Sequence, residues 1–416
     1  MVLRSVIQVD ETDEAVAAII HEPQEEVDLG SLHPAGSLYQ KSTNKTKAQE
    51  ASHNLQKMLK LHGISVYKVH KVLAKAKRES LLELAMSSLH YELSSTSTQN
   101  SETTMYYLSD KYKRETLEAL SSKSLVKIIL NRPVVELSEA AQNTHVTVDY
   151  IAERPLGNLV FTRDQQIVTA KGVVMGHLHS PQREPESIVM ELVFKTLEVP
   201  IVGKIPKEHY LEGGDFIPFG EDLCFIGTGL RTTQGAVQYM MQNELFGTKH
   251  VAVVKDVKDL NQERMHLDTV FNVVDKKHAF YLQSLLAPEK QRAVDEYEFI
   301  DGKYQQVQTD VEFSVYLQMK NLEIIWVSDA EQLDYAINFI QLGSGDLISI
   351  SATTTALLNK YNSTAIAHYV DFDGIKRMFG AAHCSTQIFR KHTPIPEGYL
   401  TELHQHLATR SHVRKL

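Results

Sequence analysis

The sequence predicts an α/β protein made of repeated strand-containing units, with one helical insertion. Three observations predict this fold class. Residues 16–69 have the pattern of a strand, a helix and a second strand, residues 72–130 carry leucines at helical spacing, and the chain after Pro133 returns to short strands separated by turns. Strands that alternate with helices along the chain are typical of α/β folds.

The first unit begins with the apolar run 16–20. We interpret it as a strand that ends before Pro23, because proline lacks the N–H that a strand would donate. Residues 47–61 have apolar side chains at helical spacing, and Gly63 suits the C-terminus of that helix. Residues 64–69 alternate between apolar and polar side chains, which predicts a second strand.

The next segment changes character, because no strand signal is strong between residues 72 and 130. We therefore predict a helical insertion domain at residues 72–133 and a catalytic α/β domain formed by residues 1–71 and 134–416. The leucines at helical spacing are Leu81, Leu82, Leu84, Leu89, Leu117, Leu120 and Leu125.

Four later segments resemble one another, because each places an aspartate just before a strand-like run. A recurring unit indicates a repeat architecture, although an aspartate before a strand is also common turn chemistry. Four such segments in one chain favour the repeat. The segments are Val160–Asp164, Leu211–Asp215, Met265–Asp268 and Leu342–Asp346, and the runs are 167–169, 216–219, 270–274 and 347–350.

The overall composition excludes several classes of partner. The formal net charge is -9, so no basic field is expected to attract nucleic acid or an anionic membrane. Two cysteines without a C-x-x-C pair predict neither a disulfide framework nor a zinc site, and they suit a reducing compartment. We see no secretory leader and no apolar run of membrane-spanning length, and we expect a cytoplasmic protein.

The repeat-like segments also contain the groups needed to hydrolyse a guanidinium. This cation is planar and rich in N–H donors, so carboxylates bind it in a bidentate way. Its carbon is a poor electrophile, which calls for a strong nucleophile and an acid that protonates the leaving amine. Cys384 follows the small residues Gly380 to Ala382 and is the candidate nucleophile, whereas Cys224 lies in an apolar run and suits an inert core thiol.

The candidate acid/base is His266, which lies two residues before Asp268, so that both side chains of an extended segment face the same side. A histidine is more often structural, and this chain has 19 of them, so position alone does not decide. Glu212 and Asp215 flank two glycines, whose tight turn leaves both acids free to point into a cavity. The alternative is a surface turn with solvated acids.

Arginine side chains are candidates for holding a substrate carboxylate. Arg183 and Arg231 have this role in our interpretation, because guanidinium groups bind carboxylates in a bidentate way. Isolated arginines usually face solvent instead, and the neighbours Arg163 and Asp164 would ordinarily form a solvated pair.

Taken together, these segments resemble the arginine deiminase family, within the larger group of guanidine-modifying enzymes. The resemblance extends from about Ala17 to the C-terminus, and its pieces follow one another in the family's order and at similar separations. Those pieces are Asn158-Leu159-Val160-Phe161-Thr162-Arg163-Asp164, Leu211 to Asp215, His266-Leu267-Asp268-Thr269-Val270-Phe271, and Gly380-Ala381-Ala382-His383-Cys384.

The resemblance implies a fold, an activity and a role for each candidate residue. The fold is a five-bladed α/β propeller, the pentein fold, with the active site at its centre and a helical insertion. Cys384 would attack the guanidinium carbon of free L-arginine, and His266 would protonate the leaving ammonia and then activate water, which gives citrulline. Neither metal nor organic cofactor is implied. Asp164 and Asp268 would hold the guanidinium, Glu212 and Asp215 would orient His266, and Asn158, Arg183 and Arg231 would hold the amino-acid end.

Two departures from the family pattern leave substrate recognition open. Phe379 stands where the family usually has an arginine, with Arg377 nearby, and Ser385 follows Cys384 where the family tends to have methionine. The same kit would suit an arginine dihydrolase, an amidinotransferase or an agmatine deiminase. A protein that binds arginine without catalysis is the alternative from another class, and a homo-oligomer is left open.

Overall fold

The computed structural model describes residues 7–95, 102–140, 145–343 and 345–391. Five three-stranded units share one hydrogen-bonding pattern. In each unit the first strand runs antiparallel to the second, and the second runs parallel to the third after a crossover that contains a helix. The α/β fold class is therefore confirmed, and so is a repeated unit.

The first unit pairs a strand near the start of the described residues with one near their end, and the other four follow along the chain. Their strands are β20 (Gln387–Lys391), β1 (Glu14–Ile20) and β2 (Ser65–Lys68); β6 (Gln166–Val168), β7 (Val173–Met175) and β8 (Ile201–Lys204); β9 (Phe216–Pro218), β10 (Leu223–Thr228) and β11 (His250–Lys255); β12 (Phe271–Val273), β13 (His278–Leu282) and β16 (Glu323–Val327); and β17 (Ile340–Gly343), β18 (Asp346–Ser349) and β19 (Ile366–Tyr369). The crossover helices are α2 (Lys45–Leu61), α8 (Glu184–Thr196), α9 (Gln234–Gln242), α10 (Phe313–Met319) and α12 (Thr353–Lys360).

Several smaller elements complete this body. The hairpin of β14 (Ala293–Ile300) and β15 (Lys303–Glu312) extends the sheet of the third unit beyond β11. Short helices lie in the connections within and between the units. They are α1 (Glu26–Gly30), α11 (Asp329–Leu333), α13 (Asp373–Lys376), η1 (Ala35–Ser37), η2 (Pro181–Arg183), η3 (Gly213–Asp215), η4 (Gln262–Arg264), η5 (Leu267–Thr269) and η6 (Gln283–Leu286).

Most of the strands expected from the sequence are present. Residues 16–20, 47–61 and 64–69 correspond to β1, α2 and β2. The runs at 167–169, 216–219 and 270–274 correspond to β6, β9 and β12, each the first strand of its unit. Every residue of these three strands is buried. The acids that precede them therefore lie next to buried strands.

The fourth repeat segment does not occupy the same place in its unit as the other three. Asp346 does not precede the first strand of its unit but begins β18, the second strand, where it pairs with Gly343 across a hairpin turn. Gly343 and Gly345 have φ values of +93° and +85°, which other residues rarely adopt. The glycines therefore serve the turn, and the residue equivalent to the earlier acids is Asn338, just before β17.

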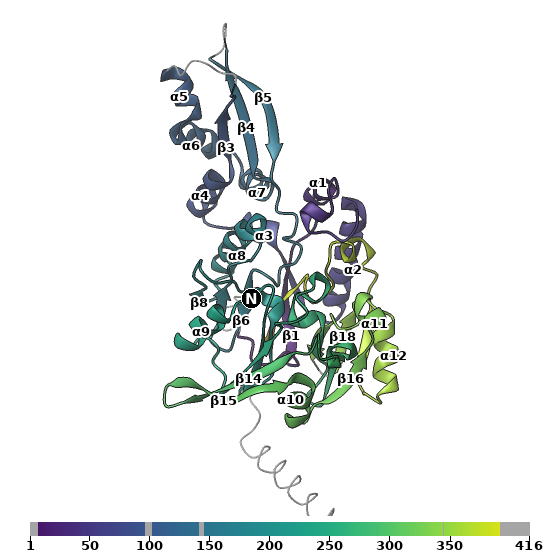
Figure 1. Ribbon diagram of the computed structural model, residues 1–416. Helices are drawn as coiled ribbons and strands as arrows, with labels where there is room; N and C mark the ends of the chain where they lie inside the picture. The colour runs from purple at the N-terminus through teal and green to yellow at the C-terminus, as the bar shows by residue number, and fades with distance from the viewer. Residues whose placement is uncertain (1–6, 96–101, 141–144, 344, 392–416) are drawn as a thin grey trace, which may run out of the picture.

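The insertion forms a separate lobe at the top of Figure 1. Its helices confirm the helical spacing, but the segment is not wholly helical, because β3 pairs with β4 and β4 pairs with β5 beyond residue 133. β3 has only four residues, which is too short for its alternation to stand out. The elements of this lobe are α4 (Arg78–Ser88), β3 (His90–Leu93), α5 (Glu102–Leu108), α6 (Asp110–Glu118), α7 (Ser122–Asn131), β4 (Pro133–Glu139) and β5 (Val146–Glu153). The preceding helix α3 (Val69–Leu73) lies beside α8 instead (Figure 1). The domain boundaries themselves stay a prediction.

Along the described ranges, no helix combines the length and the apolar character that crossing a membrane requires.

Candidate active site

One buried cavity collects side chains from the segments that precede the first strands of the units. Its empty volume is about 330 Å³. Six of the nine predicted site residues line it, and the other three, Glu212, Asp215 and Asp268, are buried and hydrogen-bonded to lining residues or their neighbours. The lining residues are Leu38, Asn158, Phe161, Asp164, Arg183, Arg231, Gln262, Met265, His266, Met378, Phe379 and Cys384.

The thiol of Cys384 faces carboxylates. Its Sγ lies 3.7 Å from Asp268 Oδ2, and its backbone N–H donates to Asn338 Oδ1 at 3.3 Å. Burial raises the pKa of the Cys384 thiol well above its ordinary value, and the charges of Asp268 and Asp164 raise it further. The empty site thus favours the neutral thiol, and a cation bound between these acids would favour the thiolate.

The imidazole of His266 is paired with Glu212. His266 Nε2 lies 2.8 Å from Glu212 Oε2, and both side chains are buried. Burial alone would lower the pKa of His266, but the hydrogen bond with Glu212 and the charges of Asp164 and Asp215 raise it to about 9. Gly214 lies against the imidazole, because a Cβ added there would lie 2.6 Å from His266 Nδ1. His266 is therefore a protonated, tightly held acid at neutral pH.

Glu212 and Asp215 both contact the segment of His266, the role that the family resemblance implies, and neither lines the cavity into which their turn predicted that they would point. Glu212 Oε1 accepts from the backbone N–H of His179 at 3.0 Å and lies 3.6 Å from Arg231 Nη1. Burial would raise the pKa of Glu212, but His266 and then Arg231 lower it to about 2. Asp215 Oδ1 accepts from the backbone N–H of Leu267 at 2.9 Å, and burial raises the pKa of Asp215 to about 6.

Asp164 and Asp268 each keep one oxygen without a partner. Asp164 Oδ2 accepts from Arg183 and Asp268 Oδ2 accepts from His383, but neither Oδ1 has a hydrogen-bond partner among the described residues. Buried polar atoms are nearly always satisfied, because leaving them unpaired costs about 1–3 kcal/mol each. These two oxygens therefore suit a ligand that donates several hydrogen bonds.

The two arginines differ in how fully they are occupied. Arg183 contacts both Asp164 and Glu186, whereas Arg231 donates to Gln262 Oε1 at 3.0 Å and its buried Nε has no partner among the described residues. Arg231 thus keeps donors for a ligand. Asn158 lines the cavity and donates from Nδ2 to the backbone oxygen of Ser37 at 2.9 Å.

The residues that depart from the family pattern lie at different places. Phe379 lines the cavity with φ of +67°, a left-handed conformation that is unfavourable for a bulky side chain. Arg377 instead pairs with Asp373 at 3.0 Å on the surface of α13. Phe379 therefore contributes an apolar wall where an arginine was expected.

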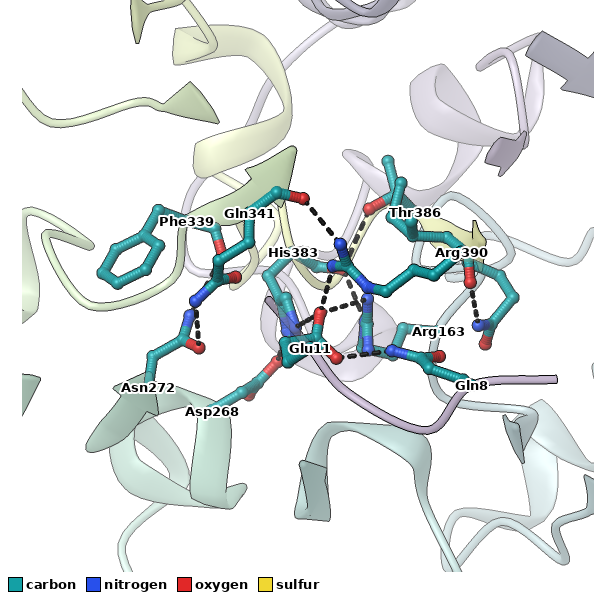
Figure 2. A network of polar contacts seen from close by, with 12 residues as sticks. Gln8, Glu11, Arg163, Asp268, Asn272, Phe339, Gln341, His383, Thr386 and Arg390 are labelled. Atoms are coloured by element: carbon teal, nitrogen blue, oxygen red, sulfur yellow. Dashed lines mark hydrogen bonds and ion pairs between the residues drawn. The ribbon is translucent and has the colours of Figure 1, made fainter. Parts of the chain in front are cut away.

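A buried ionic network beneath the cavity was missed by sequence analysis. Glu11 contacts His383 at 3.3 Å and Arg390 at 2.7 Å, and lies 3.8 Å from Arg163, while His383 Nδ1 lies 2.7 Å from Asp268 Oδ2 (Figure 2). The alternative that Arg163 and Asp164 form a solvated pair is wrong, because both side chains are buried and have separate partners. Sequence patterns contain no signal for Glu11 and Arg390, because only the pairing of β1 with β20 brings them together.

Three side chains also have the spacing of a metal site. Asp164, Glu212 and His266 offer ligand atoms that all lie within 4.8 Å of one another. Within the described residues, however, Asp164 is paired with Arg183, and Glu212 with His266. Cationic side chains thus already balance these acids.

This geometry agrees with comparisons to known proteins. The family model of arginine deiminase matches residues 37–390. The chain belongs to the arginine deiminase family. Curated relatives include arginine deiminase 1 of Staphylococcus epidermidis, 26% identical over 250 residues that cover 56% of this chain and 58% of the relative. The arginine deiminase of Halobacterium salinarum is 25% identical over 324 residues, or 58% of this chain and 65% of the relative. The chain thus spans less than two thirds of the length of these relatives.

Solved structures share the fold at low identity. The N-terminal domain of ArgZ, an arginine dihydrolase from the ornithine-ammonia cycle in cyanobacteria, superposes with a TM-score of 0.53 at 13% identity, over 90% of this chain and 97% of that one. A dimethylarginine dimethylaminohydrolase superposes with a TM-score of 0.51 at 14% identity, over 90% of this chain and 100% of that one. The mixed α/β fold of this chain is therefore that of known guanidine-modifying enzymes.

Proposed function

We propose that this protein hydrolyses the guanidinium group of free L-arginine to citrulline and ammonia through a covalent intermediate on Cys384. One observation carries the proposal. Two buried carboxylates, Asp164 and Asp268, each keep an unpaired oxygen close to a buried thiol and a protonated imidazole. A guanidinium would supply the donors that these two oxygens lack. We also propose that the five units are the blades of a propeller around this cavity, and that residues 72–133 belong to an inserted domain.

The reaction follows from the charges of these groups. A guanidinium between Asp164 and Asp268 neutralises the acids that hold the thiol protonated, so Cys384 loses its proton to water and attacks the guanidinium carbon. His266 then donates its proton to one terminal nitrogen of the tetrahedral adduct, which leaves as ammonia. The neutral His266 next takes a proton from water, whose oxygen attacks the thiouronium carbon. Expulsion of the thiolate releases citrulline.

The amino-acid end of arginine would be held by Asn158, Arg183 and Arg231. Arg231 has the spare donors that a carboxylate needs, which favours L-arginine over agmatine. The substrate is thus a small molecule, and His266, Cys384 and the acids require no cofactor for these steps.

Product analysis in oxygen-18 water tests the proposal against its alternatives. We expect one ammonia and one citrulline per arginine, with one labelled ureido oxygen in citrulline and no ornithine. Two ammonia with ornithine would establish a dihydrolase, and an amidino group on an added amine would establish a transferase. Binding of arginine without any product would establish a non-catalytic binding protein.

A further inference from the structure

The guanidinium of Arg183 occupies a position that the substrate itself would need. Arg183 Nη1 lies 2.9 Å from Asp164 Oδ2, and both side chains are buried. Asp164 can offer its free Oδ1 to a substrate while this contact is kept, but a substrate guanidinium has both oxygens to itself only if the contact opens. The free protein therefore holds an internal guanidinium against the carboxylate that is expected to bind the external one.

A second carboxylate holds the other edge of Arg183. Glu186 Oε2 accepts from Arg183 Nε at 3.1 Å and from Nη2 at 2.9 Å, and it also accepts from Gln165 Nε2 at 2.8 Å. Glu186 belongs to the first turn of α8 and is buried. Arg183 thus lies between two carboxylates. If its contact with Asp164 opens, its contact with Glu186 remains.

Resting on the function proposed above, we propose that arginine binds by exchanging partners with the Arg183–Asp164 ion pair, and that Glu186 is the positioning residue that keeps Arg183 neutralised during the exchange. The substrate guanidinium replaces Arg183 on Asp164, and the substrate carboxylate replaces Asp164 on Arg183. Neither Asp164 nor Arg183 is left unpaired at the end, because the guanidinium and the carboxylate of arginine are inserted between these two opposite charges. A buried ion pair that is opened without replacement partners would be strongly destabilising.

The exchange gives different results for arginine and for agmatine, which has the guanidinium but lacks the carboxylate. The guanidinium of agmatine can replace Arg183 on Asp164, but agmatine has no carboxylate that could replace Asp164 on Arg183. Glu186 is then the remaining anion on Arg183. The charge of Glu186 should therefore matter much more for agmatine than for arginine.

The test is Glu186→Gln, with kcat and KM measured for both compounds. Because a buried charge is then left unpaired, we expect kcat/KM for agmatine to fall by roughly a hundredfold to several thousandfold, and that for arginine by less than about tenfold. Most of the change should lie in KM, and Glu186→Asp should restore part of it. Glu184→Gln is the matched control in the same helical turn, and no ion pair of Glu184 with Arg183 is present. Equal losses for the two compounds, or no loss for either, would overturn the exchange.

A structure of the Cys384→Ala protein with arginine tests the same idea without changing Glu186. We expect both oxygens of Asp164 on the substrate and Arg183 between Glu186 and the substrate carboxylate. An intact Arg183–Asp164 pair beside bound arginine would refute the exchange. Wild-type turnover separates the two proposals. Without turnover the proposed function fails, and calorimetric affinities of arginine and agmatine for the Glu186→Gln protein still test the exchange.

Discussion

Replacing Glu212 by glutamine keeps the shape of the side chain that contacts His266 but removes its charge. The pKa of His266 is raised from its ordinary 6.5 to about 9. The hydrogen bond that His266 donates to Glu212 raises this pKa most. This difference corresponds to about 3 kcal/mol in favour of the imidazolium. The lowered pKa of Glu212 reports the same interaction, so the two shifts are not added.

The assay is the pH dependence of kcat/KM for arginine. The imidazolium is the form that protonates the leaving nitrogen, so wild-type activity should fall on the basic side with a midpoint near 9. In Glu212→Gln, burial lowers the pKa of His266 with less opposition, and the midpoint should move down by at least about one pH unit. The exposed Glu208→Gln is the control of equal charge change.

An unchanged basic midpoint in Glu212→Gln would refute this account of His266. Stability gives an independent measurement. A raised pKa stabilises the folded protein fully below pH 6.5, and this contribution is lost as the pH rises through about 9. The wild type should therefore lose up to about 3 kcal/mol of unfolding free energy across this window, and Glu212→Gln should lose less.

Three further predictions concern single side chains. Cys384→Ala should abolish turnover while calorimetry still detects arginine binding, whereas Cys224→Ala should keep nearly normal turnover, because Cys224 is buried away from the cavity; substantial activity in Cys384→Ala would exclude the covalent mechanism. Gly214→Ala should reduce kcat by at least about a hundredfold, because the new Cβ would lie 2.6 Å from His266 Nδ1, and a normal kcat would mean that the position of His266 is not critical. Arg231→Ala should bring kcat/KM for arginine down towards that for agmatine, and an unchanged ratio would remove Arg231 from carboxylate binding.

The local sequence was sufficient for the elements that short-range periodicity determines. The strand at 16–20, the helix at 47–61 and the strands after Asp164, Asp215 and Asp268 were found in this way. Six of the residues that line the cavity were also predicted, from short motifs or from the family resemblance, whereas Leu38, Gln262, Met265 and Met378 were not. A motif shows which functional groups are present, and their chemistry limits the reactions that they can catalyse together.

Only the tertiary structure decided which partners those groups have. Glu11 and Arg390 lie 379 positions apart and meet because β1 pairs with β20. Asn338 takes the place in the fifth unit that was assigned to Asp346, since a hairpin turn shifts that aspartate into the second strand. Arg183 contacts Asp164, 19 positions away, whereas its contact with Glu186 is a local one within the start of α8. The long-range contacts depend on how strands and helices far apart in the sequence pack together. The residues next to a side chain in the sequence do not specify that packing.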